Sequence, residues 1–306
     1  MENKIILYYK YITLADTNQI YKWQKKLCEQ LALKGRVIIA HEGINGTLGG
    51  STAAINEYMY QMKQNEFFFD TDFKESAGGP EHFPRLSVKI RPEIVALSRK
   101  LKKPITETPG TYVTPQQAHE MMSQQRDDVV IFDVRNTYES RIGCFIGAVK
   151  ADIQNFRDLP EYIDKNKELF RDKEVIMNCT GDVRCEMSSA YLKELHIAKK
   201  VYHIQGGIHR YAEAYPNGFF RGRNYVFDGR ISLKVTDDIL ATCDFCPTAY
   251  DHYFNCINTQ CNKQIIVCPA CQQKERFTCS ENCAQLVMSG QVKVRVQERT
   301  AIKQGE

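Results

Sequence analysis

The sequence predicts an α/β protein built from several domains, and three observations support this class. The chain has 306 residues, 43% of them hydrophobic, which is enough for more than one core. Strand and helix patterns alternate through two successive regions, and eight of the twelve cysteines lie within residues 243–283. We expect domains at 1–96 and 113–216, a linker at 97–112, a connector at 217–240 and a cysteine-rich tail at 241–306.

Composition predicts a cytoplasmic protein without a membrane partner. The apolar run Ile5–Leu14 contains tyrosines and Lys10, so it predicts a strand and not a signal peptide, and no run approaches about 18 apolar residues. In that compartment the cysteines are expected as thiols or metal ligands. The net charge of +4 permits a polyanionic partner without requiring one.

The first region alternates strands and helices, which predicts a ferredoxin-like (acylphosphatase-like) sandwich. Asn45-Gly46 predicts a tight turn. The expected strands are Ile5–Ile12, Gly35–Ala40, Phe67–Phe73 and Leu86–Arg91, and the expected helices are Asn18–Leu33 and Ala53–Gln64.

Two polar features of this region are candidates for binding. His41 and Glu42 form either a catalytic pair or the polar end of a strand beside a glycine turn, and we keep them as binding candidates. The basic run Ser98–Pro104 in the linker predicts a solvated surface, or a contact with phosphates if it lies beside a cleft.

In the second region short apolar strands alternate with helices, which predicts a parallel sheet with a site at the carboxyl ends of its strands. The helices are expected at Thr114–Gln124, Leu159–Leu169, Glu186–Leu195 and from Gly206-Gly207 through Tyr211, and the strands at Val129–Phe132, Glu174–Asn178 and, as the last one, Val201–Ile204.

The loop Cys179-Thr180-Gly181-Asp182-Val183-Arg184-Cys185 joins one of these strands to a helix. Loop amides, the positive end of the helix dipole and the charge of Arg184 favour a thiolate at Cys179, which makes it a candidate nucleophile. The alternative is an inert buried cysteine at a strand end. Cys185 is a candidate resolving thiol or a packing residue.

Four motifs of this region together resemble the rhodanese sulfurtransferase domain, whose loop cysteine carries a persulfide. They are Asp133-Val134-Arg135, Gly143–Ala148, the Cys179–Arg184 loop and Gln205-Gly206-Gly207. The resemblance makes Asp133 and Arg135 supporting residues. Four residues separate Cys179 from Arg184, fewer than in the phosphate-binding loop of related phosphatases. The smaller loop suits a sulfur atom better than a phosphate group. Cys144 and Asp182 depart from the pattern, and we expect the Asp182 carboxylate to point away from Cys179, since it would otherwise raise the pKa of the thiol.

Over nearly the whole chain the sequence resembles the oxygen-dependent tRNA uridine hydroxylases. His41–Asn45, Cys179–Gly181, Arg184–Glu186, Asn224–Asp228 and the cysteine-rich tail support the resemblance. It implies an oxidoreductase that forms 5-hydroxyuridine at position 34 of tRNA, with Cys179 catalytic, molecular oxygen as co-substrate and an unknown electron donor. Asp182 and Val183 replace Gly and Ile of the family's loop. The chain shows no flavin or nucleotide motif and no readable iron site.

The connector interleaves cations with aromatic residues, a pattern that suits a single-stranded RNA loop. The alternative is a strand docked on the central domain. Its candidate cations for tRNA binding are Arg221, Arg223, Arg230 and Lys234, and His41 and Glu42 of the first region belong to the same set of candidates.

The tail contains four close cysteine pairs, which predict two structural zinc sites with four thiolates each. An iron–sulfur cluster or free thiols are the alternatives, and Glu281 or His252 is a possible substitute ligand. The predicted ligands are Cys243, Cys246, Cys256, Cys261, Cys268, Cys271, Cys279 and Cys283.

Two other function classes compete with the tRNA hydroxylase. The loop alone predicts a sulfurtransferase that carries a cysteine persulfide, and the domains without chemistry predict an RNA- or protein-binding module. The extra N-terminal domain and the basic connector favour a macromolecular substrate over a small anion.

Overall fold

The computed structural model describes residues 2–108, 110–273 and 277–295. Residue 109 of the predicted linker, and residues 274–276 and 296–306 of the predicted tail, lie outside this description. The chain divides into two compact units, Met1–Asp237 and Asp238–Glu306. Within the described ranges every helix is too short or too polar to span a bilayer.

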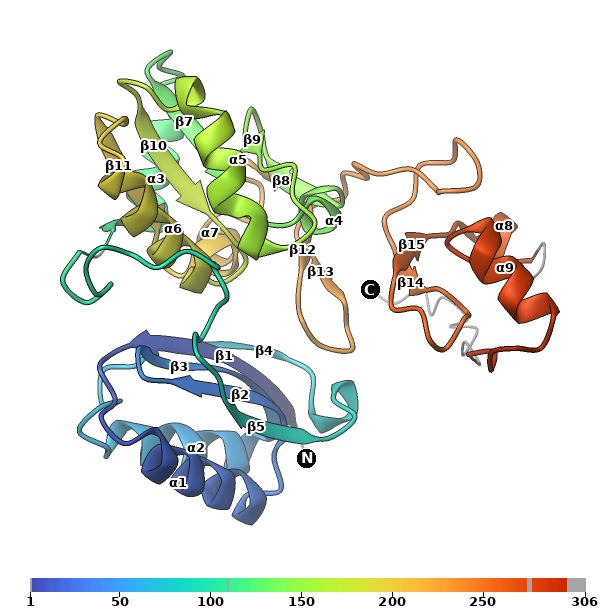
Figure 1. The fold of residues 1–306 in the computed structure, drawn as a ribbon, viewed down its shortest axis with the longest axis horizontal. Coiled ribbons are helices and arrows are strands. Elements are labelled where there is room, and N and C mark those ends of the chain that lie inside the picture. The colour runs from blue at the N-terminus through green and yellow to red at the C-terminus, as the bar shows by residue number, and fades with distance from the viewer. Residues whose placement is uncertain (1, 109, 274–276, 296–306) are drawn as a thin grey trace. The chain divides into compact units, whose positions relative to one another are not determined.

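The first unit begins with a five-stranded sheet in the order β4-β1-β3-β2-β5. All neighbours are antiparallel except β2 and β5. Helices α1 and α2 cover one face, where Ile20 and Ile55 join the core (Figure 1). This confirms the predicted ferredoxin-like sandwich. Its elements are β1 Asn3–Tyr11, α1 Thr17–Gln30, β2 Lys34–Ala40, β3 Gly43–Ser51, α2 Thr52–Lys63, β4 Phe73–Ala77, a 3₁₀ turn at Pro80–His82 and β5 Leu86–Ile90.

Two local predictions in this sandwich were wrong. Asn45-Gly46 lies within β3, not in a turn, and the turn is at His41-Glu42, because Ala40 pairs with Gly43. A Cβ at position 46 would come within 2.3 Å of the Tyr8 ring, so the glycine makes room for a tyrosine.

The segment 67–72 is likewise no strand, since β4 begins only at Phe73. Successive tight turns place Phe68 in the core, stacked on Trp23 with ring centroids 5.9 Å apart.

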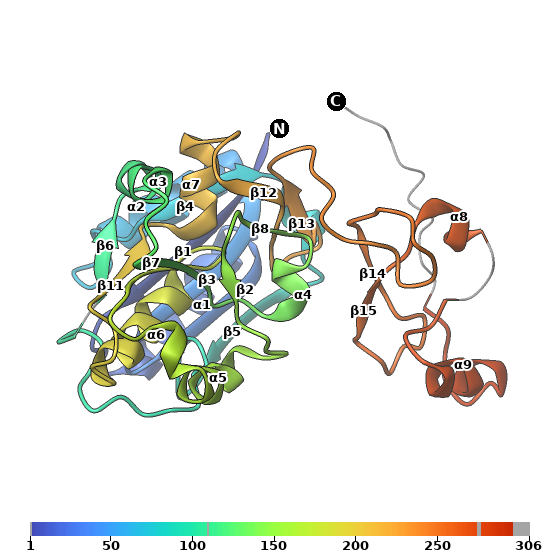
Figure 2. The same cartoon turned by 90° about the horizontal axis from the view of Figure 1, so that it is seen from above.

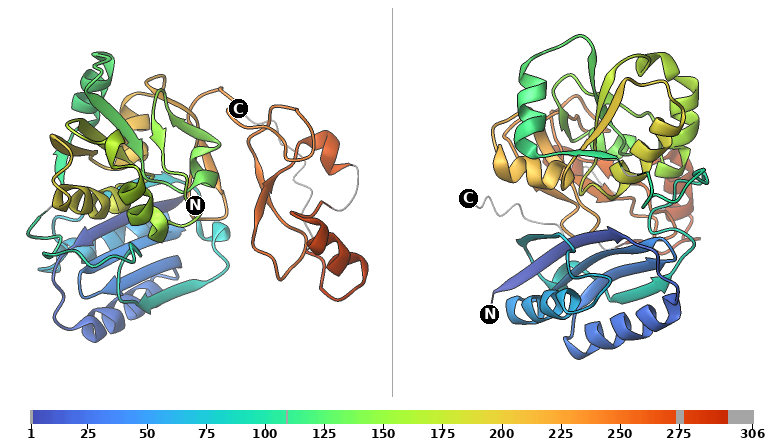
Figure 3. Two further views of the ribbon diagram at one scale, coloured as in Figure 1. Left: turned by 45° about the horizontal axis from the view of Figure 1, so that its top comes forward. Right: turned by 90° about the vertical axis from the view of Figure 1, so that its left-hand side faces the viewer.

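The second region forms a parallel sheet in the order β6-β11-β10-β7-β9. Helices α5 and α6 pack on one face and α3 and α7 on the other (Figure 2). The N-terminal sheet lies between its own helices and this domain (Figure 3). The elements are β6 Thr111–Val113, α3 Pro115–Ser123, β7 Val129–Asp133, α4 Thr137–Ser140, β8 Gly143–Phe145, β9 Val149–Lys150, 3₁₀ turns at Phe156–Asp158 and Lys167–Leu169, α5 Leu159–Lys165, β10 Glu174–Asn178, α6 Val183–Glu194, β11 Lys200–Ile204 and α7 Gly207–Ala214.

Local sequence features explain two of these elements. Thr114 and Gln117 form a reciprocal capping box at the start of α3, with Pro115 as its first residue. Helix α5 is shorter than predicted because it ends at Lys165, and a separate 3₁₀ turn follows.

The predicted connector folds back onto the parallel domain. β12 (Phe220–Tyr225) pairs antiparallel with β8 and with β13 (Ser232–Lys234). Val201–Ile204 is therefore the last strand of the parallel sheet only, and a small second sheet follows it.

The second unit is a small fold with short elements. β14 (Tyr253–Asn255) and β15 (Gln264–Ile266) form a hairpin, and the helices are α8 (Pro269–Gln272) and α9 (Glu281–Met288). One apolar cluster among its described residues joins Ile257, Val287 and Val292. So small a core indicates that further links hold this unit together.

Candidate active site and metal centre

Cys179 follows β10 directly and stands on the loop that leads into α6. Its side chain is fully buried. The sulfur accepts a hydrogen bond from the amide of Asp182, with N and Sγ 3.2 Å apart. The thiol thus lies at the carboxyl edge of the parallel sheet, where such sheets place their sites.

The other side of the loop rests on the start of α7. The amides of Ile208 and His209 donate to the carbonyls of Cys179 and Thr180 at 2.9 and 3.1 Å. Gly207 has φ +64°, and a Cβ there would lie 2.5 Å from the Cys179 carbonyl oxygen. The Gly206-Gly207 pair therefore allows a close approach that any larger residue would prevent.

The surroundings of Cys179 favour its thiolate. Burial by itself would raise the pKa of the thiol. Hydrogen bonds from the Cys185 thiol and amide and the charge of Arg184 outweigh burial and the opposing charge of Asp182, and lower the pKa of Cys179 to about 6. Cys185 itself is buried and has a raised pKa, because of burial and of the neighbouring Cys179. Near neutral pH these shifts favour a thiolate at Cys179 and a protonated thiol at Cys185, which acts as its hydrogen-bond donor.

A carboxylate that sequence analysis missed binds the guanidinium of Arg184. Glu139 of α4 accepts two hydrogen bonds from Arg184 at 2.6 and 2.7 Å, and both side chains are buried. Phe227 lies 5.4 Å from the same guanidinium. The charge of Arg184 therefore reaches Cys179 only after partial neutralisation, and the pair braces the loop against α4.

We expect Arg184→Ala to cost about 3–5 kcal/mol of folding free energy, because it leaves Glu139 buried without a partner. The double variant Glu139→Gln with Arg184→Met removes both charges and should recover most of that loss. Urea unfolding of the three proteins measures the difference. If Arg184→Ala is as stable as the parent protein, the pair does not brace the loop.

The expectation that Asp182 points outward was wrong. Its carboxylate is 1% exposed and accepts from His203 Nδ1 at 2.6 Å, from the Tyr9 hydroxyl at 3.1 Å and from the Gly206 amide at 3.3 Å. Buried carboxylates require such partners. His203 and Tyr9 come from β11 and from the N-terminal sheet, so the loop sequence contains no sign of them.

The N-terminal sheet packs on the thiol loop with the face that α1 and α2 do not cover. Leu7, Tyr9 and Tyr11 alternate along β1 and so share one face. A Cβ at Gly181 would lie 2.5 Å from a methyl group of Leu7, and the Tyr11 hydroxyl donates to the Val183 carbonyl at 3.1 Å. The sheet thus contributes to the complete burial of Cys179.

Asp133 and Arg135 form an ion pair with no exposed side-chain surface, and Nη2 and Oδ2 are 2.6 Å apart. Arg135 also donates to the Gly143 carbonyl at 2.6 Å. These contacts tie the end of β7 to β8. The two residues therefore support the domain at the strand that pairs with β10, beside the thiol loop.

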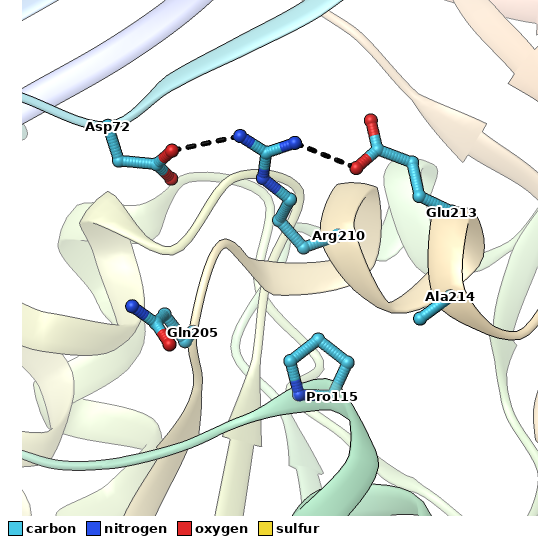
Figure 4. Close-up of a pocket in the computed structure, with 6 residues that line it drawn as sticks. All are labelled: Asp72, Pro115, Gln205, Arg210, Glu213 and Ala214. Atoms are coloured by element: carbon cyan, nitrogen blue, oxygen red, sulfur yellow. Dashed lines mark hydrogen bonds and ion pairs between the residues drawn. The ribbon is translucent and has the colours of Figure 1, made fainter.

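A cavity of about 500 Å³ lies beside the Gly206-Gly207 turn (Figure 4). Arg210 spans it from α7 and binds Asp72 and Glu213, each at 2.9 Å. Gln205 and Pro115 lie on the opposite side. Because the Arg210 guanidinium is already paired with two carboxylates, this cavity does not favour the binding of a phosphate group.

The weak binding candidates are scattered. His41 is exposed at its turn, whereas Glu42 accepts from the Ile94 amide at 2.8 Å and has a pKa raised by burial. Arg230 binds Asp228, Ser76 and the Ala77 carbonyl. Arg223 donates to Ser232 at 2.8 Å, and Lys234 pairs with Asp237 at 2.5 Å. Arg221, half-buried on β12, completes the set.

The tail cysteines come together in two groups of four, and within each group all sulfurs lie within 4.8 Å of one another. Each group could hold one metal ion. His252 instead contacts Asp251 at 2.8 Å, and neither it nor Glu281 joins a group. One group is Cys243, Cys246, Cys268 and Cys271, and the other is Cys256, Cys261, Cys279 and Cys283.

Comparison with family models agrees with this architecture. Residues 3–94 match a UPF0176 acylphosphatase-like domain, residues 114–214 a rhodanese-like domain and residues 221–284 a rhodanese C-terminal model. The parallel sheet and its thiol loop thus define a rhodanese-domain protein. Among solved structures, a rhodanese-like domain from Anabaena sp is 18% identical over 36% of this chain and 78% of that one, with a TM-score of 0.31.

Curated relatives narrow this class to one family. The tRNA uridine(34) hydroxylase of Corynebacterium urealyticum is 39% identical over 92% of this chain and 97% of its own length. That of Aster yellows witches'-broom phytoplasma is 40% identical over 92% of each chain, and that of Listeria welshimeri is 39% identical over 92% of this chain and 88% of its own. The chain belongs to the tRNA uridine(34) hydroxylase family.

Proposed function

We propose that this protein hydroxylates uridine 34 of tRNA to 5-hydroxyuridine, and that Cys179 is its catalytic residue. Family membership supports the substrate and the reaction. The buried Cys179 thiol, with its pKa lowered to about 6, supports the residue. A protein that acts on tRNA would work in the cytoplasm, as the sequence predicts.

The overall chemistry fixes which partners are needed. One atom of dioxygen enters the C5–H bond, and the other leaves as water after taking up two electrons and two protons. Oxygen is therefore a co-substrate, and a two-electron donor is a required partner. A thiolate can act in two ways. It can attack the uracil ring as a nucleophile and so activate it, or its sulfur can carry oxygen as a sulfenic species.

Arg184, Cys185 and the loop residues Thr180–Val183 are proposed as supports of that sulfur. Thr180 donates to the Tyr225 carbonyl at 3.1 Å, and Arg184 also contacts the Thr180 hydroxyl at 3.3 Å. The Cys185 thiol hydrogen-bonds the Cys179 sulfur. It is thus also placed to resolve an oxidised Cys179, with the loss of its proton as the required step.

The decisive experiment is nucleoside mass analysis of tRNA from cells that lack the gene. Loss of the added oxygen on uridine 34, and its return with the wild-type gene, supports the hydroxylase. Unchanged 5-hydroxyuridine together with a lost sulfur transfer activity would support a persulfide sulfurtransferase, the function that the loop alone predicts.

We also propose that cations of the linker and the connector bind tRNA phosphates. A cavity of about 450 Å³ is lined by basic groups from the linker and from the end of α6, together with two glutamates: Lys102, Lys103, Lys193, His196, Glu107 and Glu194. The basic run thus lies beside a cleft in which lysines outnumber the two glutamates, and this supports the proposed phosphate contact. In the connector, Arg221 and Arg223 remain the candidates, whereas Arg230 holds β4.

We expect Arg221→Ala with Arg223→Ala to weaken tRNA binding and to flatten its salt dependence, by about 0.7–0.9 in log–log slope for each phosphate that the variant no longer neutralises. Filter binding at several salt concentrations measures both. Lys165→Ala is a control outside the linker and the connector, because Lys165 is an exposed cation of α5 that pairs with Glu161. A double variant with the slope of the parent protein would leave these arginines a purely structural role.

A further inference from the structure

Asp182 and His203 form a buried pair of ionisable side chains next to Cys179. The proposed reaction does not use this pair. Its Nδ1–Oδ1 distance is 2.6 Å, and the two side chains are 1% and 0% exposed. His203 lies on β11, where it pairs in register with Met177 of β10, two residues before Cys179. The pair therefore connects the neighbouring strand to the thiol loop.

The backbone at Asp182 shows what the pair holds in place. Asp182 is the N-cap of α6 and has φ +83° and ψ −25°, a left-handed conformation that is unfavourable for a residue with a side chain. In this conformation its amide donates to the Cys179 sulfur. Three hydrogen bonds to its carboxylate, one of them from His203, offset the backbone cost and fix the direction of that amide.

The charges around Cys179 also indicate that His203 supports the thiolate. The Asp182 carboxylate opposes a thiolate at Cys179, and a positive imidazolium next to it would cancel most of that opposition. Burial works against a charge on His203, but Asp182, Glu186 and Cys179 outweigh it and raise the pKa of the imidazole. The groups facing Cys179 are Asp182, Arg184, Cys185 and, from β1, Tyr11.

Among the described residues, Asp182 is the hydrogen-bond partner that holds the His203 ring. The Tyr112 ring of β6 lies against the imidazole with centroids 4.2 Å apart, and Gly110 closes the edge at Nε2. Nε2 is buried and has no hydrogen-bond partner among the described residues. The ring orientation is thus set by the bond from Nδ1 to Asp182.

We propose that His203 is a positioning residue, which through its short Nδ1–Oδ1 contact with Asp182 fixes the carboxylate and so keeps the Asp182 amide directed at the Cys179 sulfur. This inference rests on the proposed role of the Cys179 thiolate and not on the reaction that follows. It predicts that the two residues act as one unit. Removing the imidazole alone leaves the buried Asp182 carboxylate with only the Tyr9 hydroxyl and the Gly206 amide as partners, whereas removing the carboxylate as well takes away the charge that opposes the thiolate.

The test measures the pH dependence of Cys179 alkylation by iodoacetamide in the full-length, metal-loaded protein, with mass spectrometry of the peptide that contains it. The pH midpoint is compared, and not the absolute rate, because the midpoint reports the pKa of the thiol, whereas the absolute rate also reflects access to a buried sulfur. His203→Gln should raise the midpoint by about one pH unit, so that alkylation below the midpoint is about tenfold slower. Asp182→Asn with His203→Gln should return the midpoint to within a few tenths of the wild-type value, since asparagine tolerates the left-handed conformation.

His119→Gln is the matched control. His119 lies on α3 of the same domain and contacts the Tyr211 hydroxyl at 2.8 Å, so its loss should leave the Cys179 midpoint unchanged. A wild-type midpoint in His203→Gln, or an equally raised one in the double variant, overturns the proposal. If His203→Gln fails to fold, a folded double variant with a wild-type midpoint still supports it, and an unfolded one overturns it. Uridine hydroxylation is not the readout, so failure here leaves the proposed function standing.

Discussion

Cys179→Ser should abolish uridine hydroxylation, by about 10³-fold or more, while the protein stays folded. Serine nearly preserves the volume and the hydrogen bonding of the thiol, but its hydroxyl does not ionise near neutral pH. The buried loop, the amide of Asp182 and the Arg184–Glu139 pair can all remain in place. The measurement is 5-hydroxyuridine in tRNA from cells that lack the gene and express the variant.

The neighbouring thiol provides the matched comparison. Cys185→Ser changes the same atom type in an equally buried position on the helix that follows the loop, and we expect a milder loss, about tenfold or less. It removes a hydrogen bond to Cys179, and an external reductant can replace a resolving thiol but not an attacking one. Thermal unfolding of both variants controls for stability. A folded Cys179→Ser protein that restores the modification would exclude thiol chemistry at this position.

The outcome also separates the competing functions. A sulfurtransferase would lose persulfide formation in Cys179→Ser but would never have hydroxylated tRNA. A binding module would complement fully with either serine. Only a thiol-dependent hydroxylase loses the modification with Cys179→Ser and keeps a measurable part of it with Cys185→Ser.

Sequence predicted those parts of the fold and site that depend on neighbours along the chain. The apolar run of β10, the loop after it and the cap at Thr114 each consist of consecutive residues with a local physical reason. Asn45-Gly46 and Phe67–Phe73 failed because their roles are set elsewhere. Gly46 accommodates the Tyr8 ring, and Phe68 stacks on Trp23.

The same limit applies to the site. Cys179 was found from its own loop, but Glu139 and His203 come from other elements, and only the packing brings them to Arg184 and Asp182. A general rule would have narrowed the search, because polar residues at the carboxyl ends of neighbouring parallel strands meet at one edge. The direction of the Asp182 side chain depended on His203 and could not be read from its loop.

Each cysteine group in the second unit is compact enough to bind a single ion. Zinc–thiolate bonds of about 2.3 Å place the sulfurs of a tetrahedron about 3.8 Å apart. Cys246 lies 3.5 Å from both Cys268 and Cys271, and Cys279 lies 3.6 Å from Cys261 and 3.8 Å from Cys283. In an iron–sulfur cluster of four irons each thiolate binds a different iron, and the sulfurs stand farther apart. We therefore propose one structural zinc ion for each group.

The groups are interleaved, since the first cysteine pair joins the third and the second joins the fourth. This pairing cannot be read from the order of the pairs, because every way of joining the four pairs two by two is compatible with it. Interleaving means that each ion closes a loop containing a ligand pair of the other. With so small a core, loss of the ions should unfold the second unit first.

We expect about two zinc ions per chain in the purified protein. When a chelator is added, the second unit should unfold before the first. The pairing gives a sharper test with double variants. Cys243→Ser with Cys268→Ser disrupts one site and should leave about one zinc, whereas Cys243→Ser with Cys256→Ser disrupts both and should leave about none. Cys144→Ser, a half-buried thiol of the first unit, is the control and should keep both ions. Elemental analysis together with circular dichroism measures the content and the folding. The same zinc content in both double variants would contradict the interleaved pairing, and a metal-free protein with a folded second unit would exclude structural zinc altogether.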